Sequence, residues 1–433
     1  MPASGRVRKP LPAHAADLDA EELPPVGASY IWLMVLAQFG VWVAFITPLA
    51  ISLSVRIDKL APGHEEYLGY VTGAGAAFSV LTAPLLGVLS DRTRCRLGRR
   101  RPFMIGGMVV GVVSLVVMAL AANVPLLGLG WILAQLGWGS VVGALVNSQA
   151  DRLPESQRGK VAGLVGFTQQ IGPVLGVVMA GAITGNALLL FLVPGIFGVV
   201  LATLFVVFVH EEDSRTMEAG EPLTALSLAR KYVFDPRRYP DYFWNWLGRF
   251  LFYFGLTFNT TFTAFFFASR LGVSVEEVAG TIAALAGLGV VATALGAVGG
   301  GFLSDRLRRR RVFVLAGALV FSVGAVTMAL ATAVPALFAG SLACSLGIGA
   351  FAAVDQALLL DVLPERGTEA GRYTSIFNFA ATIPQAVAPL IAPVFLGIGV
   401  AAGEGKNYSL LYIVAAACTL AGGLIVLRVR AVR

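Results

Sequence analysis

Charged residues are scarce in this 433-residue chain: they make up 13% of it, while 57% of the residues are hydrophobic. Soluble domains carry about 25% charged residues, so this composition excludes an ordinary soluble globular protein. A bilayer core requires roughly 20 apolar residues for each helical crossing. The scarcity of charge therefore predicts an α-helical membrane protein.

Cysteine and histidine are also rare, with three residues of each. Cys95, Cys344 and Cys418 are scattered and odd in number, which predicts free thiols rather than a disulfide framework or a metal site. The sequence also lacks a P-loop and any constellation of nucleophile, metal or cofactor residues. We therefore expect no metal, no cofactor and no enzymatic activity.

Twelve apolar runs are long enough to cross a bilayer as helices. They are continuous and rich in Gly and Ala, unlike the alternating ten-residue strands of a membrane barrel. The runs lie at about 30–53, 67–89, 102–121, 126–150, 161–184, 188–209, 242–268, 276–303, 311–331, 334–362, 372–396 and 408–427.

The basic residues are divided unequally between the two sides of the predicted membrane. If the N-terminal tail is cytoplasmic, 27 of the 32 Lys and Arg residues fall on the cytoplasmic side. Four fall on the other side (Arg56, Lys59, Arg270 and Lys406), and Arg249 lies inside a span. By the positive-inside rule both termini are cytoplasmic, and the net charge of +7 reflects orientation rather than a nucleic-acid partner.

The charged and polar stretch after the sixth run divides the chain into two sets of six spans. We expect a disordered cytoplasmic tail at 1–28, a six-helix bundle at 29–209, a cytoplasmic linker at 210–241 and a second bundle at 242–433. The composition, rich in Ala, Gly, Val and Arg, suggests a GC-rich bacterium and hence the plasma (inner) membrane.

Two loop motifs occur once in each half of the chain. Gly-Val-Leu-Ser-Asp-Arg at 87–92 recurs as Gly-Phe-Leu-Ser-Asp-Arg at 301–306, an offset of 214 residues. Asp-Arg-Leu-Pro-Glu at 151–155 recurs as Asp-Val-Leu-Pro-Glu at 361–365, an offset of 210. Six spans separate the copies, so both copies lie on the same side, which predicts two parallel, pseudo-symmetric bundles.

The stretch from Gly87 to Phe103 resembles the signature loop of the major facilitator superfamily, with its Gly, Asp-Arg and Gly-Arg-Arg elements. The fuller form, Ser-Asp-Arg followed by Gly-Arg-Arg-Arg-Pro-Phe, is similar to the sucrose–proton and glycoside–cation symporters. Gln-Phe-Gly at 38–40, Thr47-Pro48 and Ala150-Asp151 also fit that branch, whereas the plant proteins have an Arg where this chain has Leu-Val-Asn at 145–147. The resemblance implies the major facilitator fold of twelve transmembrane helices in two six-helix bundles.

The resemblance also implies a conformational latch at the ends of the second and eighth spans. Asp91 is expected to face the start of the eleventh span near Gly371, and Asp305 the start of the fifth span near Gly159. Arg92 and Arg306 would reach Asp151 or Asp361 and close the cytoplasmic side. Arg101 is a further candidate residue of this latch. The alternative is that these residues only fold the loop locally.

Two charges inside spans predict a coupling site. Asp355 lies about 9 Å from the cytoplasmic end of the tenth span, and Arg249 about 12 Å deep in the seventh. An unpaired charge in hydrocarbon costs at least about 2.5–3.5 kcal/mol, so each must pair or face water. The pair either couples a proton or cation to transport or is a static ion pair that fixes two helices.

Polar side chains recur at helical spacing along several spans and mark candidate cavity faces. Amide groups match the hydroxyls of a sugar, and aromatic rings match its apolar faces. The alternative is that each side chain only forms hydrogen bonds between helices. The candidate substrate-binding residues are Gln38, Trp42, Gln135, Trp138, Gln169, Gln170, Trp246, Tyr253, Asn378 and Gln385.

These features predict a secondary active transporter that works by alternating access. The leading hypothesis is symport of a sugar or glycoside with a proton or sodium ion, by a monomer in the lipid bilayer. The alternative is a proton-driven exporter of a drug or metabolite. The abundance of Asn and Gln in the spans favours the sugar.

Overall fold

The apolar runs form long α-helices in a computed structural model of the chain. The structure describes residues 24–183, 185–211, 213–216, 234–365, 369–400 and 405–431, and no β-strand occurs within these ranges. The prediction of an all-α membrane protein is therefore confirmed.

The first half of the chain contains six crossing segments. Its first crossing contains a π-helical turn that begins at Pro48, where the missing N–H interrupts the regular hydrogen-bond ladder. The bounds are α1 Ala28–Thr47, η1 Pro48–Ser52, α2 Leu53–Leu60, α3 Glu66–Arg92, α4 Arg101–Leu120, α5 Val124–Arg152, α6 Glu155–Gly181 and α7 Ala187–Phe208.

The second half has the same plan, and a short 3-10 turn (η2 Ser214–Thr216) precedes it. Its first crossing is broken, because α9 and α10 bend by 50° where they meet. The bounds are α9 Pro240–Thr261, α10 Thr263–Leu271, α11 Val278–Leu307, α12 Arg310–Leu330, α13 Val334–Val362, α14 Ala370–Gly397 and α15 Tyr408–Val426. Eleven segments of the described chain are long and apolar enough to cross a membrane, and the bent pair gives the predicted twelfth.

Each half packs as its own bundle. In the first, α1 packs against α6 and α7, α5 against α3 and α4, and α4 against α7; in the second, α9 packs against α14 and α15, α13 against α11 and α12, and α12 against α15. Small residues allow close approach at equivalent places: a Cβ at Gly137 would lie 2.4 Å from the Gly111 backbone, and one at Gly347 would lie 2.5 Å from that of Phe321. The prediction of two similar six-helix bundles is therefore confirmed.

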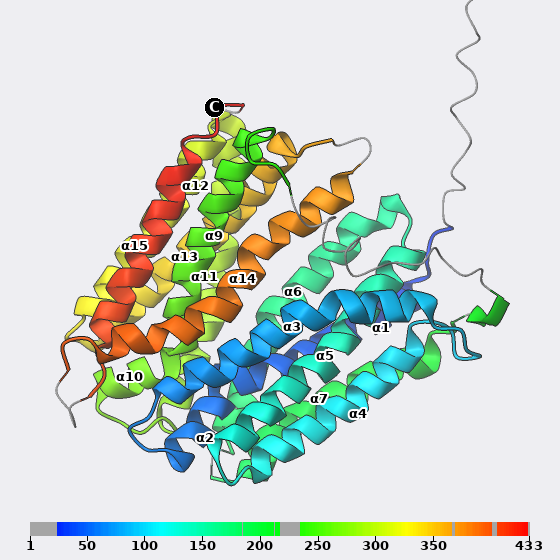
Figure 1. Ribbon diagram of the computed structural model, residues 1–433, viewed down its shortest axis with the longest axis horizontal. Helices are drawn as coiled ribbons and strands as arrows, with labels where there is room; N and C mark the ends of the chain where they lie inside the picture. The colour runs from blue at the N-terminus through cyan, green and yellow to red at the C-terminus, as the bar shows by residue number, and fades with distance from the viewer. Residues whose placement is uncertain are drawn as a thin grey trace, which may run out of the picture.

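The two bundles meet along α3 with α14 and along α6 with α11. We call the end that holds Arg100 and Arg310 the arginine-rich end, and the end that holds α2 and α10 the opposite end. The bundles lie together at the opposite end and splay apart toward the arginine-rich end (Figure 1). The molecule thus has a V shape.

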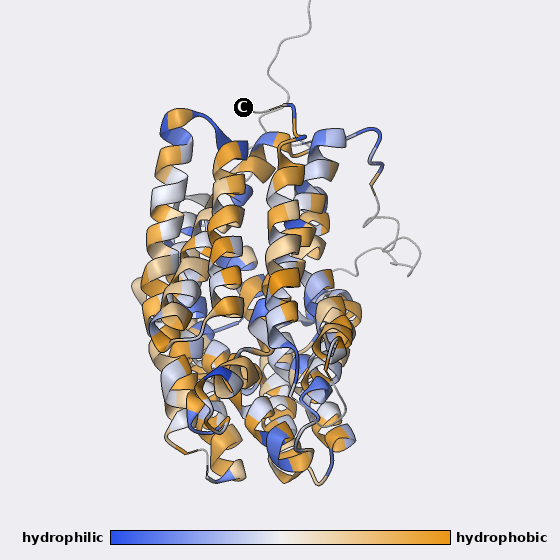
Figure 2. Cartoon of the chain, turned by 90° about the vertical axis from the view of Figure 1, so that its left-hand side faces the viewer, coloured by the Kyte–Doolittle hydropathy of each residue, from blue (hydrophilic) through white to orange (hydrophobic). Residues whose placement is uncertain are grey.

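The outer surface of the helices is apolar. Val113, Leu120, Val323 and Leu330 are among many exposed aliphatic side chains. Hydrophobic residues run along the helices, while hydrophilic ones gather at the ends and in the loops (Figure 2). Such a surface fits the hydrocarbon of a bilayer, whereas a soluble protein would not expose it.

The predicted tail and linker fall largely outside the described residues. Positions 1–23 of the tail and positions 212 and 217–233 of the linker are in that category. The domain boundaries at 28, 209 and 241 therefore remain predictions.

Candidate functional site

A cavity of about 380 Å³ lies between the two bundles. Both halves line it, so a molecule bound there would contact both bodies of the V. Its lining residues are Ile46, Leu49, Ala50, Thr72, Ala76, Trp131, Gln135, Tyr253, Leu256, Thr257, Thr260, Thr261, Thr263, Ile282, Gln385 and Pro389. Of the predicted substrate-binding residues, the structure brings Gln135, Tyr253 and Gln385 together here.

Trp131 provides an aromatic surface of this cavity that the sequence did not single out. Its ring stacks on Phe45 with centroids 6.0 Å apart, and Gly75 of α3 leaves room for it, because a Cβ there would lie 2.3 Å from the indole. Trp131 precedes Gln135 by one helical turn and so shares its face. This spacing in the sequence would have been enough to predict that Trp131 lines the cavity.

Threonine hydroxyls supply hydrogen-bond acceptors along the α9 wall. Thr257 donates to the Tyr253 carbonyl at 2.7 Å, Thr260 to Leu256 at 3.0 Å, and Thr261 to the Thr257 carbonyl at 2.8 Å. Each hydroxyl hydrogen is thereby used within the helix, while the oxygen lone pairs remain available. This wall suits a ligand that donates hydrogen bonds, as hydroxyl groups do.

A second cavity of about 320 Å³ adjoins the first and shares Thr260, Thr263 and Ile282 with it. Gln169 and Gln170 of α6 line it, together with Pro173 in the same helix. Two more of the predicted residues therefore face the space between the bundles.

The predicted ion pair between Arg249 and Asp355 is present inside the second bundle. An Nη1 hydrogen of Arg249 bonds to Oδ2 of Asp355, whose side chain is fully buried. The guanidinium also lies over the rings of Tyr253 and Phe377, at 4.9 and 4.6 Å from their centroids. Because Tyr253 lines the central cavity, the pair stands directly behind the cavity wall.

Several polar atoms near this pair lack hydrogen-bond partners among the described residues. They are Nε of Arg249, Oδ1 of Asp355 and both amide atoms of Asn245, which precedes Arg249 by one turn. A buried polar group without a partner costs about 1–3 kcal/mol. The cluster therefore has hydrogen-bonding capacity that the described residues leave unused.

The other predicted substrate-binding residues lie elsewhere. Trp138 is fully buried between α4 and α5, with a Gly111 Cβ position 2.7 Å from its ring. Trp246 donates its Nε1 hydrogen to the Ile376 carbonyl of α14 at 2.9 Å. Both side chains pack against neighbouring helices, as the helix-packing alternative expects, and neither lines the two cavities described above. Their role in substrate binding stays a prediction.

Gln38 and Trp42 of α1 lie on the side of that helix that meets α6. Neither amide atom of Gln38 nor Nε1 of Trp42 has a partner within the described ranges, and Gln38 is only 1% exposed. A Cβ at Gly172 of α6 would lie 3.0 Å from the Trp42 side chain. Asn378 of α14, in contrast, is exposed.

The carboxylates of the predicted latch gather around two arginines at the arginine-rich end. Arg100 pairs with Asp91 at 2.6 Å and with Asp151 at 2.9 Å, and Arg99 also pairs with Asp151 at 2.6 Å. In the second half, Arg310 pairs with Asp361 at 2.7 Å and with Asp305 at 3.4 Å. The two motifs thus form the same cluster twice, once in each bundle.

Further equivalent contacts support the repeat. Arg101 donates to the Val209 carbonyl, and Arg311 donates to the Val429 carbonyl. At the opposite end, Arg56 donates to the Ala121 carbonyl at 2.7 Å, and Arg270 to the Ala329 carbonyl at 2.6 Å. Arg101 therefore fixes the end of α7 in this structure and does not pair with a latch carboxylate there.

At the arginine-rich end, where closure between the halves is expected, the two bundles lie apart in this structure (Figure 1). A Cβ at Gly159, near the start of α6, would meet nothing within 4 Å, and Arg306 is exposed. In this structure Arg310 contacts the latch carboxylates of the second bundle, and the pairing of Arg306 with a carboxylate stays a prediction for the closed state. The splay of the bundles separates the two halves at the arginine-rich end.

Polar contacts join the halves at the opposite end instead. Lys59 pairs with Glu276 at 2.5 Å, Glu66 pairs with Lys406 at 2.7 Å, and the Tyr408 hydroxyl donates to Glu65. Burial raises the pKa of the Glu65 carboxyl above its usual value, against the opposing effects of the Tyr408 hydrogen bond and the Lys406 charge. We call these residues the opposite-end contacts.

Two similar bundles of six membrane-spanning helices, with a cavity between them, define a multi-pass membrane transporter. A family model described as Major Facilitator Superfamily matches residues 27–299 and 246–433. The chain belongs to the Major Facilitator Superfamily, whose members are transporters and not enzymes.

Short stretches resemble two curated proteins. The general alpha-glucoside permease of Schizosaccharomyces pombe is 31% identical over 112 residues, which cover 24% of this chain and 19% of that protein. An uncharacterized symporter of Synechocystis is 51% identical over 41 residues, which cover 10% of this chain and 8% of that protein. The matches thus span less than a fifth of either relative.

Solved structures share the fold over most of the chain. The nucleoside transporter NupG has a TM-score of 0.72 at 10% identity. The aligned region covers 93% of this chain and 98% of the NupG chain. A bacterial homologue of the human lysosomal transporter Spinster, in an inward-facing and unoccupied conformation, has a TM-score of 0.68 at 17% identity, with coverage of 93% and 96%. At these identities the likeness concerns the fold alone.

Proposed function

We propose that this protein is a secondary active transporter that carries a sugar or glycoside together with a proton or another cation. It works by alternating access as a monomer, in the plasma (inner) membrane. The positive-inside rule makes the arginine-rich end cytoplasmic, so both termini lie on that side. The V-shaped conformation is then the inward-facing one.

The composition of the central cavity carries the proposal of a sugar. It combines the indole of Trp131 and the ring of Tyr253 with the amides of Gln135 and Gln385 and a row of threonine hydroxyls. A sugar offers apolar faces to stack on rings and hydroxyls for amides and hydroxyls to bind. The short similarity to a glucoside permease supports the same substrate class.

The buried pair of Arg249 and Asp355 is the proposed coupling site. It stands behind Tyr253, so a change in the charge of Asp355 would alter the position of Arg249 and hence one wall of the cavity. A carboxylate that exchanges an arginine for a proton or a cation has two states of different geometry. Such a two-state element is what coupling requires.

The latch residues have a proposed role in the outward-facing state. Asp91 and Asp305 are exposed at the splayed end, each held by an arginine of its own bundle. When the bundles close at that end, these carboxylates would meet the starts of α14 and α6, where helix N-termini attract negative charge. Arg100 and Arg310 would hold them in position for that contact.

Uptake by proteoliposomes tests the proposal. Purified full-length protein is reconstituted, and a panel of labelled mono- and disaccharides and glycosides is offered under an imposed proton or sodium gradient, with protein-free liposomes as the control. We expect one of these compounds to accumulate against its own gradient only while the ion gradient lasts. If none accumulates under either gradient, the alternative of a proton-driven exporter replaces symport.

A further inference from the structure

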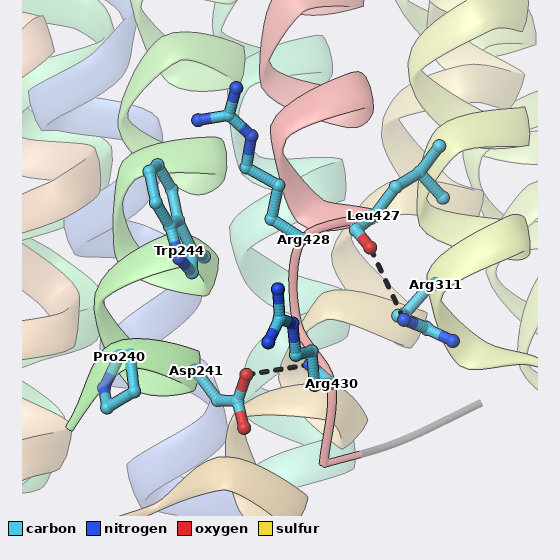
Figure 3. Close-up of a pocket in the computed structure, with 7 residues that line it drawn as sticks. All are labelled: Pro240, Asp241, Trp244, Arg311, Leu427, Arg428 and Arg430. Carbon is cyan, nitrogen blue, oxygen red and sulfur yellow. Dashed lines mark hydrogen bonds between the residues drawn. The ribbon is translucent and has the colours of Figure 1, made fainter.

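A further pocket, distinct from the two cavities between the bundles, lies at the arginine-rich end of the second bundle. It has a volume of about 620 Å³ and is formed by the beginnings of α9 and α12 and the segment after α15 (Figure 3). Its lining residues are Pro240, Asp241, Trp244, Arg311, Leu427, Arg428 and Arg430. The lining thus contains three arginines and one aspartate.

The segment that carries two of these arginines is held by hydrogen bonds. Arg311 donates to the Leu427 carbonyl at 3.3 Å and to the Val429 carbonyl. Asp241 accepts from the backbone N–H groups of Arg430 at 2.7 Å and Ala431 at 3.1 Å, the first of which is drawn in Figure 3. These bonds occupy the aspartate oxygens and hold the segment that follows α15 in place.

The positive charges of Arg428 and Arg430 face the pocket without a carboxylate partner of their own among the described salt bridges. The Arg428 guanidinium lies over the Trp244 ring, 4.7 Å from its centroid. Figure 3 shows its side chain running back alongside the last turns of α15. A guanidinium turned toward the membrane and stacked on an indole is placed at the headgroup level, where tryptophan is enriched.

The first bundle shows that the fold does not require these charges. Because Arg101 binds the Val209 carbonyl as Arg311 binds that of Val429, the two segments can be matched. The positions of Arg428 and Arg430 are then taken by Phe208 and His210. The basic residues are therefore a local addition to a shared frame.

We propose that this pocket binds the phosphate group of an anionic phospholipid. Two arginine side chains would hold the phosphate oxygens, and the ring of Trp244 would lie at the glycerol level. The exposed side chains of Leu424 on α15 and of Leu427 just after it would contact the acyl chains. Basic pockets between transmembrane helices on the cytoplasmic side are suited to such headgroups.

Native mass spectrometry of the purified full-length protein with added lipid tests this proposal. We expect phosphatidylglycerol to bind more tightly than phosphatidylcholine at the first site filled. In Arg428→Gln/Arg430→Gln the affinity for phosphatidylglycerol should fall about 30-fold, since each arginine near a lipid headgroup contributes about 1 kcal/mol. The matched control is Arg94→Gln/Arg96→Gln, which removes the same charge from an exposed loop at the same end of the other bundle and should bind as the wild type does.

Two further variants separate binding from folding. Arg430→Gln alone keeps the backbone contact with Asp241 and should lose about fivefold in affinity. Arg428→Lys/Arg430→Lys keeps the charge and should retain most of the binding. Equal loss in the control pair, or unchanged binding in both glutamine variants, would overturn the proposal.

A third arm distinguishes the source of the phosphate. Inorganic phosphate and glycerol 3-phosphate are added in place of lipid, and then in competition with phosphatidylglycerol. We expect neither to bind nor to displace the lipid at a hundredfold higher concentration. Displacement by either would make the pocket a site for a soluble phosphate and would reject the lipid. This test measures lipid binding and not uptake. Its outcome is therefore independent of the proposed substrate.

Discussion

At the scale of single residues, Asp355 offers the sharpest test of ion coupling. Replacing it with Asn removes its charge but keeps its shape. If Asp355 carries the coupling ion, Asp355→Asn should still exchange labelled for unlabelled substrate across proteoliposomes, because exchange needs no net ion movement. Accumulation driven by a proton or sodium gradient should be lost.

The matched variant Asp355→Asn/Arg249→Gln distinguishes coupling from a static ion pair. Asp355→Asn leaves a buried arginine unpaired, which costs about 3–5 kcal/mol of stability. The double variant removes that charge as well and should regain thermal stability without regaining accumulation. Accumulation that still follows the ion gradient in either variant would reduce the pair to a structural role.

Asp91 tests the latch. Asp91→Asn removes the ion pair with Arg100 and the charge proposed to meet the start of α14. We expect normal expression with initial uptake lowered about tenfold, the size of one charge-assisted hydrogen bond. Asp213→Asn, which removes an exposed carboxylate paired with the nearby Arg215, serves as the control and should leave uptake unchanged. Equal uptake by the two variants would show that Asp91 only folds its loop.

Sequence reasoning found the ion pair of Arg249 and Asp355 because charges inside spans are rare and their depths could be counted. It missed Arg100, because five arginines between positions 94 and 101 look alike and only the start of α4 decides which of them turns inward. Trp131 and Trp138 lie two turns apart on one face of α5. Which of them meets the cavity depends on the crossing of neighbouring helices, and that crossing leaves no mark in the spacing.

At the scale of elements, the crossing of α3 and α14 sets how tightly the opposite end closes. A Cβ at Gly69 would lie 2.2 Å from the Pro389 carbonyl oxygen, so Gly69→Val should force the helices apart at a cost of about 1–3 kcal/mol. We expect a cysteine placed at Thr72 of the cavity to react about tenfold faster with an impermeant maleimide added from the opposite end. Gly106→Val, where a Cβ meets open space, should not change that rate. An unchanged rate in Gly69→Val would mean that this crossing does not gate the cavity.

We predict that Glu65, which lies just before α3 and accepts a hydrogen bond from Tyr408 of α15, makes this contact sensitive to pH. Burial raises its pKa above the usual 4.5, against Tyr408 and Lys406, while Asp58 and Glu66 raise it further. When the bundles separate there, the carboxyl is hydrated and its pKa falls back. Protonation therefore favours the closed contact, whose stability should increase as the pH falls through the raised pKa and decrease as the pH rises.

The same cysteine at Thr72 reports this effect. Labelling from the opposite end should slow down on acidification in the wild type, compared with a Glu65→Gln protein measured at each pH. The glutamine variant resembles the protonated form and should stay closed at all pH values. A constant ratio of the two rates between pH 4.5 and 7.5 would contradict the prediction.

The break between α9 and α10 shows what the sequence left undetermined at this scale. The run at 242–268 reads as one straight span, because it contains no Pro and its two glycines, Gly248 and Gly255, lie away from the break at Phe262. Thr260, Thr261 and Thr263 all donate hydroxyl hydrogens to carbonyls one turn earlier, a pattern that bends helices. The helix propensity of these threonines does not determine whether such a cluster only curves a helix or breaks it.

At the scale of the whole molecule, the number of spans and the two-bundle plan followed from run length and repeated motifs. The conformation did not follow from the sequence, because the sequence of a transporter that alternates between two states must be compatible with both of them. Contacts at Lys59, Glu66 and Glu276 define the state seen here, whereas the loop motifs predicted contacts at the end where the bundles lie apart (Figure 1). The sequence therefore predicts the two bundles that move, but it does not predict their relative position in any one structure.

A reversible cross-link tests that state. In a background with Cys95, Cys344 and Cys418 replaced by Ser, Lys59→Cys and Glu276→Cys should be bridged rapidly by a short bis-methanethiosulfonate, since their native side chains meet at 2.5 Å. Transport should stop and return on reduction. The control pair Gly159→Cys and Asp305→Cys, at the splayed end, should bridge slowly. Full transport by the bridged first pair would show that the opposite end need not open.

The opposite-end contacts also bear on how the membrane voltage acts on this protein. Two partly exposed ion pairs and one hydrogen bond contribute about 1 kcal/mol each at most. Moving a single elementary charge through 100 mV changes the energy by about 2.3 kcal/mol. A closure this weak is comparable with the electrical work on one charge, so the resting orientation of the empty transporter is expected to follow the voltage of the cell as well as the chemistry of its gates.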